Sequence, residues 1–126
     1  MYRAYGLLKP NTEFTLDAAA PKLAAALPHL TPNRQEGLLQ FANDEWEIHL
    51  KMNASPDVLD ESLVIAGQIS GAEDEPGIRT CAARVEVSSA VIDEGMAYFG
   101  DFLKVIDVLK SFPGVIMVEP EGPSLM

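Results

Sequence analysis

The feature that most constrains the fold is an alternation of polar and apolar residues over positions 45–52. A period of two places successive side chains on opposite faces of a strand, so the segment predicts a half-buried strand. Together with residues 36–42 it predicts a β-hairpin that turns at Asn43-Asp44. The predicted cross-strand pairs are Phe41 with Trp46, Leu39 with Ile48, Gln40 with Glu47, Leu38 with His49 and Glu36 with Lys51. The turn lacks a glycine at its second position, which leaves a longer loop open.

A wide apolar face predicts a helix over 95–112. Apolar side chains recur there at every third or fourth position and form two adjacent rows. The rows are Tyr98, Phe102, Val105, Leu109 and Phe112, beside Phe99, Leu103 and Ile106. A face this wide usually contacts more than one surface. We therefore expect part of it, or an exposed sheet edge, to be covered by a second copy in a homodimer.

The other patterns predict strands over 2–8, 78–88 and 115–118 and a helix over 14–27. Proline fits the first turn of a helix, so Pro21 moves the expected start of that helix toward Asp17 or Ala18. Cys81 is expected on the apolar face of the strand 78–88, together with Ala83, Val85 and Val87. Residues 58–69 remain open between helix and strand. Their β-branched residues and Gly67 favour one helical turn followed by a strand.

The predicted order β-α-β-β-β-β-α-β indicates an α+β fold. We expect an antiparallel sheet of about five or six strands with two main helices packed on one face. By element order alone, this resembles ferredoxin-like and TBP-like sheets, which implies nothing about function. The length of 126 residues predicts one domain over 1–126, with a short polar, proline-rich tail from about residue 119. The expected core residues are Trp46, Phe41, Ile48, Phe102, Ile106 and Leu109.

Negative charge is concentrated in one segment. Ten of the nineteen carboxylates lie between residues 36 and 75, where Lys51 is the only base, and the net charge is −10. Such a field disfavours nucleic acid and anionic membranes as partners and speeds encounter with a basic protein. We therefore predict a non-catalytic partner-binding protein: an adaptor, an inhibitor or an immunity-type protein. The expected partner-binding residues are Glu45, Glu47, His49, Asp57, Asp60 and Glu61, extended by the acids at 73–75.

Signatures of catalysis or cofactor binding are weak. His49 with Glu45 and Glu47 could contribute to a metal site, but zinc needs about four ligands and His29 is the only other histidine. The acidic run 73–75 lacks the spacing of a calcium loop. Cys81 fits a buried small residue better than a nucleophile. The glycine spacing excludes a dinucleotide or P-loop motif. We predict no catalytic, cofactor-binding or metal-binding residue.

Two alternatives stay open. One is an enzymatic or small-ligand-binding domain with a pocket between sheet and helices, lined by Trp46, Phe41 and the Tyr98 row. The other is a soluble domain whose acidic surface has no specific partner. A single cysteine and the lack of a long apolar run predict a cytoplasmic protein.

Overall fold

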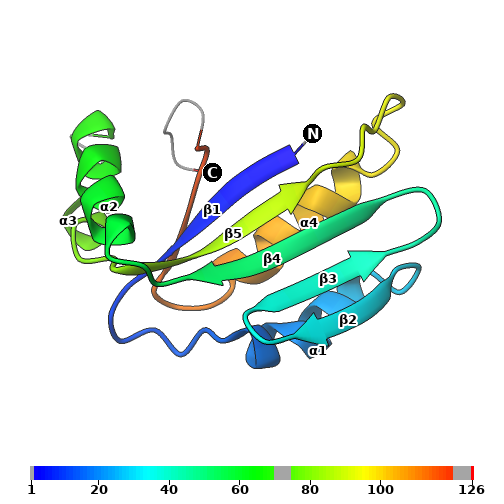
Figure 1. Cartoon of the computed structure of the whole chain (residues 1–126), viewed down its shortest axis with the longest axis horizontal. Coiled ribbons are helices and arrows are strands. Elements are labelled where there is room, and N and C mark those ends of the chain that lie inside the picture. The colour runs from blue at the N-terminus through cyan, green and yellow to red at the C-terminus, as the bar shows by residue number, and fades with distance from the viewer. Residues whose placement is uncertain (1, 70–74, 121–125) are drawn as a thin grey trace.

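A computed structural model describes residues 2–69, 75–120 and 126. Six strands and four helices follow one another along these residues (Figure 1). In chain order they are β1 (Tyr2–Leu8), α1 (Leu16–Ala26), β2 (Thr31–Gln35), β3 (Leu38–Ala42), β4 (Glu47–Asn53), α2 (Asp57–Gln68), α3 (Glu75–Ile78), β5 (Ala83–Ser89), α4 (Phe99–Lys110) and β6 (Val115–Val118).

The strands form one antiparallel sheet in the order β2-β3-β4-β5-β1-β6, and α1 and α4 lie along one face of it (Figure 1). This confirms the predicted α+β class. The four strands β6-β1-β5-β4, linked by α1 and α4, have the β-α-β-β-α-β order of ferredoxin-like sheets. The hairpin β2–β3 extends that sheet beyond β4.

The main core lies between the sheet and the helices α1 and α4. It contains all six residues expected there: Trp46, Phe41, Ile48, Phe102, Ile106 and Leu109. The apolar faces of α4 and of the sheet are both stabilised by removal from water, and they bury each other in this core. The apolar face of α4 also contacts α1, so the chain itself covers most of the surface that motivated a homodimer. Leu103 remains 42% exposed.

A second, smaller core lies on the opposite face, where α2 and α3 cover the β1–β6 end of the sheet. Figure 1 shows α2 standing at that end. The members of this core are Leu7, Ile65, Ala66, Ile78, Cys81, Ile116 and Val118. The same face of β3 and β4 carries polar residues, as expected for a sheet with one solvated face.

The strand predicted within 58–69 is wrong, because α2 continues to Gln68. Its buried residues are Val58, Ser62, Ile65 and Ala66, a helical spacing that buries one side against the sheet. Tertiary packing therefore outweighs the weak strand preference of the β-branched residues. The sheet still has six strands, because β2, which the sequence did not predict, takes the place of the strand expected within 58–69. Every residue of β2 is exposed, so it lacks the apolar alternation that identifies a strand.

The β3–β4 register is two residues away from the predicted one. The loop spans residues 43–46, and Phe41 pairs with Ile48 and Gln40 with His49. The side chain of Asn43 accepts hydrogen bonds of 2.8 Å from the backbone N–H groups of Glu45 and Trp46, which stabilises this longer turn. A shift by an even number keeps each side chain on its predicted face.

Two local predictions also need correction. Helix α1 begins at Leu16, because the hydroxyl of Thr15 accepts a hydrogen bond from the N–H of Ala18 at 3.0 Å and caps the helix. Pro21 consequently lies inside the helix. Strand β5 begins at Ala83, so Cys81 precedes it and is buried in the smaller core. The predicted tail from residue 119 lies largely outside the described residues, as do Glu73 and Asp74.

Strand β2 forms one edge of the sheet. Just beyond the two ends of β3, the N–H of Asn43 donates to the C=O of Trp46 and the C=O of Gly37 accepts from the N–H of Met52 of β4. The odd-numbered residues of β3 therefore face β4 and the even-numbered ones face β2. The partners of these even-numbered residues are Thr31, Asn33 and Gln35. The backbone nitrogen of Pro32 therefore points away from the sheet.

Candidate functional site

The structure divides the six predicted partner-binding residues between two ends of the molecule. Glu45 lies in the β3–β4 loop, whereas Glu47 and His49 lie on the solvated face of β4. Asp57, Asp60 and Glu61 lie on α2, beyond the other end of β4. Seven residues of extended chain span about 20 Å, so the two groups do not form one continuous surface. Glu45 precedes β4, so strand alternation does not determine on which face its side chain lies, although Glu45 and Glu47 are at the same end of the sheet.

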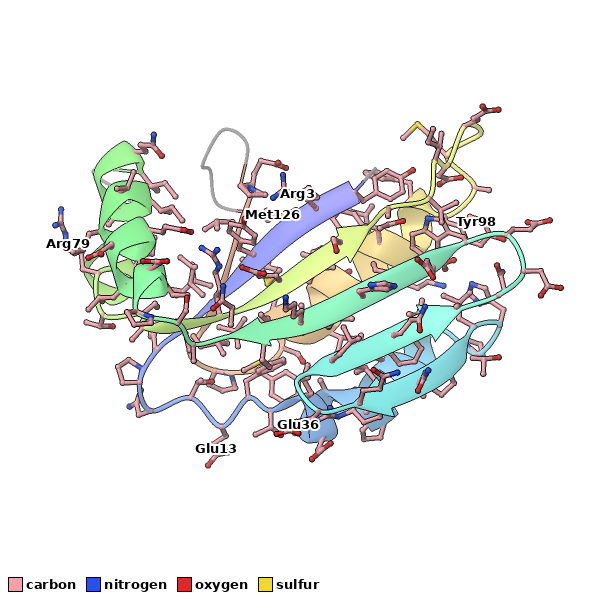
Figure 2. All side chains as sticks on the ribbon, in the orientation of Figure 1. Arg3, Glu13, Glu36, Arg79, Tyr98 and Met126 are labelled. Carbon is pink, nitrogen blue, oxygen red and sulfur yellow. The ribbon has the colours of Figure 1, made fainter. Side chains whose placement is uncertain are left out.

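At the end of the sheet opposite α2, two loops join to form what we call the acidic corner: residues 43–47 and residues 90–98. Figure 2 shows Tyr98 at this end. The ring of Tyr98 stacks on Trp46, and its hydroxyl donates to a carboxylate oxygen of Glu45 at 2.9 Å. The side-chain amide of Asn43 donates to the same hydroxyl at 3.1 Å. Tyr98 thus fixes the β3–β4 loop to the start of α4.

Asp93 holds the second loop of the acidic corner. Its carboxylate accepts hydrogen bonds from the hydroxyl of Tyr2 at 2.8 Å and from the backbone N–H groups of Ala97 and Tyr98 at 3.0 and 2.8 Å. Burial alone would raise the pKa of Asp93, but these three donors outweigh it and lower that pKa. The pKa of Tyr2 is raised by burial and by Asp93.

Two apolar side chains project from the second loop of the acidic corner, residues 90–98. Ile92 is 74% exposed and Met96 is 58% exposed. Met96 has a φ of 54°, a backbone conformation that residues other than glycine rarely adopt. The two segments of the acidic corner contain five carboxylates and no Lys or Arg: Asp44, Glu45, Glu47, Asp93 and Glu94. The corner therefore combines apolar side chains with negative charge.

Glu47 of the acidic corner pairs with His49, which lies next to the corner on the solvated face of β4. The Nε2 atom of His49 is 3.3 Å from a carboxylate oxygen of Glu47, and the side-chain amide of Gln40 donates to the other oxygen at 2.8 Å. His29 instead pairs with Asp101 of α4 at 2.7 Å. Over the described ranges, no three His, Cys, Asp or Glu side chains converge in a way that could hold a metal ion.

An ion-pair network, which the sequence pattern did not reveal, anchors α2 to the sheet. Arg84 of β5 is only 5% exposed and pairs with Glu61 of α2 and with Glu86 at 2.7 Å. Its guanidinium lies over the ring of Tyr5, 4.1 Å from the centroid. Asn53 donates to Glu86 at 3.1 Å. Glu61, a predicted partner-binding residue, is thus engaged within the chain.

The pKa values of the two charged groups of β5 in this network, Arg84 and Glu86, shift in opposite directions. Burial alone would lower the pKa of Arg84 and raise that of Glu86. Hydrogen bonds and the attraction of opposite charges together outweigh burial in both cases, so the pKa of Arg84 is raised and that of Glu86 is lowered. Both groups are therefore held in their charged forms. This arrangement fixes the position of α2.

Cys81 has the surroundings of a structural residue. It is fully buried, and its thiol lies 3.4 Å from the C=O of Gly77. Burial raises the pKa of the thiol to about 11, well above the range in which a thiolate nucleophile works near neutral pH. This agrees with the predicted buried role.

Among the described residues, no helix is long and apolar enough to cross a membrane. A scan against protein-family models, a search of curated proteins and a search of solved structures each give no match to this chain.

Proposed function

We propose that this is a non-catalytic binding protein that engages a basic protein partner through its acidic corner. The observation that carries the proposal is the exposure of Ile92 and Met96 on a surface whose two segments hold five carboxylates and no Lys or Arg. Apolar anchors with a charged surround are a common arrangement at protein interfaces. The negative field would speed association with a positively charged surface.

The hydrogen bonds of the corner support this proposal, because they fix both loops before any partner arrives. Asp93 holds the backbone around Met96, and Tyr98 links that segment to Glu45. A surface that is already ordered loses less conformational entropy on binding. The unusual backbone conformation of Met96 is retained although its side chain packs into no core, which is the kind of local strain often found at functional sites.

The test is affinity capture from a lysate of the native source, followed by binding kinetics with the purified captured protein. We expect Ile92→Ser with Met96→Ser to weaken binding, and Glu45→Gln with Glu94→Gln to slow association. Association of the wild-type protein should also slow as ionic strength rises from about 0.01 to about 0.15 M, where the Debye length falls from about 30 to about 8 Å.

Glu13→Gln is the matched control, because Glu13 is an exposed acid far from Tyr98 in Figure 2. This variant should bind like the wild-type protein. A captured partner that binds the corner variants and the control equally well would refute the proposal. Failure to capture any partner would favour an acidic surface without a specific partner.

The ligand-binding alternative has one observation in its favour. Within the described part of the chain, the buried atoms Trp46 Nε1 and Ser89 Oγ have no hydrogen-bond partner. Against it, Trp46 and Phe41 are packed in the core and Trp46 stacks on Tyr98, so the residues suggested as a lining pack against the protein itself. A thermal-shift screen of small metabolites tests this alternative, and a ligand whose stabilising effect is lost in Ser89→Ala would support it.

Two further expectations belong with this proposal. A cytoplasmic location rests on the single cysteine of the sequence. The main reason to expect a homodimer through α4 no longer holds, since α1 and the sheet cover most of the apolar face of that helix. Light scattering at tens of micromolar tests the homodimer.

A further inference from the structure

We infer that the outer face of α2 is a second docking surface, which binds a basic amphipathic helix of another protein. This outer face consists of Leu59, Leu63 and Val64 with the acids Asp57 and Asp60. It is separate from the acidic corner, and the inference does not depend on the function proposed for that corner.

Apolar residues are distributed over both sides of α2. One side of the helix is buried through Val58, Ser62, Ile65 and Ala66. The other side exposes three large apolar side chains: Leu59 at 40%, Leu63 at 43% and Val64 at 61%. Leu59 and Leu63 are four residues apart and therefore lie in one row. A solvent-facing helix side normally carries mostly polar residues, yet the described part of the chain covers this stripe only in part.

Contacts with the rest of the chain fix α2 in place. Glu61 pairs with the buried guanidinium of Arg84, and the hydroxyl of Ser62 donates to the C=O of Cys81 at 2.7 Å. Ile65 and Ala66 pack into the smaller core. These contacts orient the buried side of the helix toward the sheet, so the opposite side is presented to the surroundings. A helix side with apolar residues four apart is suited to packing against another helix.

The surface of α2 is negatively charged. Residues 52–78 contain no Lys or Arg, and Asp57 and Asp60 are exposed on α2. Glu61 is already paired with Arg84. The charged side chains that α2 itself carries are therefore all negative, and an occupant with basic residues flanking its own apolar row would complement them.

A second copy of this chain fits the stripe poorly. Helix α2 contains no Lys or Arg, so on a second copy of this helix Asp57 and Asp60 would meet no basic side chain, and the like charges of the two copies would repel. The helix has twelve residues and is about 18 Å long, which is too short to bury the roughly 800 Å² per partner of a standard interface by itself. A basic helix from a different protein avoids the repulsion, and a weak contact of this size suits a transient interaction.

The two surfaces lie at opposite ends of the molecule. Figure 2 shows Arg79, next to α3 and close to α2, at one end and Tyr98 at the other. One partner could occupy each end at the same time. Simultaneous binding at both ends would suit an adaptor, which is one of the functions predicted from the sequence.

The experiment uses a synthetic 18-residue helix with a Leu row flanked by Lys as the probe, and ¹⁵N-labelled full chain as the target. We expect chemical-shift changes on residues 57–68 at low salt. A peptide in which every Lys is replaced by Glu should cause no such changes. Leu63→Ser with Val64→Ser should weaken binding at least about tenfold, because a loss of 1.4 kcal/mol already has that effect. Leu59→Ser is a second, milder variant, in case the double variant unfolds.

Leu103→Ser is the matched control, because Leu103 of α4 is as exposed as Leu63. It should bind the Lys peptide like the wild-type protein. Shift changes confined to residues 43–47 and 90–98, or equal binding by the α2 variants and the control, would overturn the inference. Self-association that is lost in Leu63→Ser would also overturn it, since the occupant would then be a second copy. Corner variants such as Glu94→Gln should leave the α2 shifts unchanged, which separates this test from that of the corner.

Discussion

The indole of Trp46 and the ring of Tyr98 lie almost parallel, with centroids 4.9 Å apart and an angle of 7° between their planes. This stack joins the end of the β3–β4 loop to the start of α4, two segments that are distant in sequence. Trp46 is the only tryptophan of the chain, so its fluorescence reports directly on the acidic corner.

Removing the ring of Tyr98 should therefore change the emission of Trp46. In Tyr98→Ala, we expect a red shift, because water gains access to the indole. Tyr98→Phe keeps the ring and loses only the hydroxyl bonded to Glu45, so its emission should stay close to that of the wild-type protein. Identical spectra for the wild-type and alanine variants would contradict the stack.

The lowered pKa of Asp93 predicts a pH-dependent contribution to stability. Its folded-state pKa lies below the ordinary value of 3.8, so its contribution is fully present above about pH 4 and is lost as the pH falls through the folded-state pKa. The free energy of unfolding of Asp93→Asn should thus be lower than that of the wild-type protein at pH 7, and the difference should shrink below about pH 4. Urea unfolding across this range measures it, and a constant difference would argue against the prediction.

Replacing the buried Arg84 should be costly. Arg84→Met leaves Glu86 without its main charged partner, and breaking a buried pair in this way costs on the order of 3 kcal/mol. Glu61→Gln should cost less than about 1 kcal/mol, because the side chain of Glu61 is 50% exposed. Both variants should speed hydrogen exchange in α2 relative to α4. Equal free energies of unfolding for the two variants would show that Arg84 is not the anchor.

Two adjacent residues of α4 test the main core. Phe102 is buried, and Phe102→Ala should lower the free energy of unfolding by about 3–5 kcal/mol. Leu103 is 42% exposed, and Leu103→Ala should cost less than about 1 kcal/mol. Urea unfolding compares them, and a loss below about 1 kcal/mol for Phe102→Ala would remove this residue from the core.

Cys81 should resist alkylation in the folded protein. Its thiol is fully buried and has a pKa of about 11, so little thiolate is present or accessible at pH 8. Iodoacetamide should modify it only after urea is added, as followed by mass spectrometry. A matched reactive control is Ala54→Cys in a Cys81→Ala background, because Ala54 is exposed. Rapid modification of Cys81 without urea would contradict this prediction.

The sequence predicted the elements whose apolar pattern reflects one buried face. The alternation around Ile48 placed the correct residues inside, and an error of two in the register did not alter the faces. The loop length depended instead on the side chain of Asn43, which bonds the backbone within the turn. The β-branched residues Val64 and Ile65 favour a strand only weakly, and the packing of Ile65 and Ala66 into the smaller core outweighs this preference, so the segment is a helix.

The acidic corner and the α2 anchor could not be predicted in the same way. Glu45 and Tyr98 are 53 residues apart in sequence, and Glu61 and Arg84 are 23 residues apart, so no local spacing connects them. The clustering of acids was visible in the sequence, but they are divided between two ends because β4 runs between the two groups. Strand β2 was missed because an exposed edge strand has no apolar side to detect.

The outward-facing nitrogen of Pro32 has a consequence for how these molecules behave when crowded together. A strand arriving from another molecule would find carbonyl groups along the free edge of β2, but at position 32 no amide hydrogen. Strand-by-strand polymerisation into fibrils needs an unbroken row of donors and acceptors. A single proline at the rim thus interrupts the template for aggregation while leaving the ladder to β3 complete.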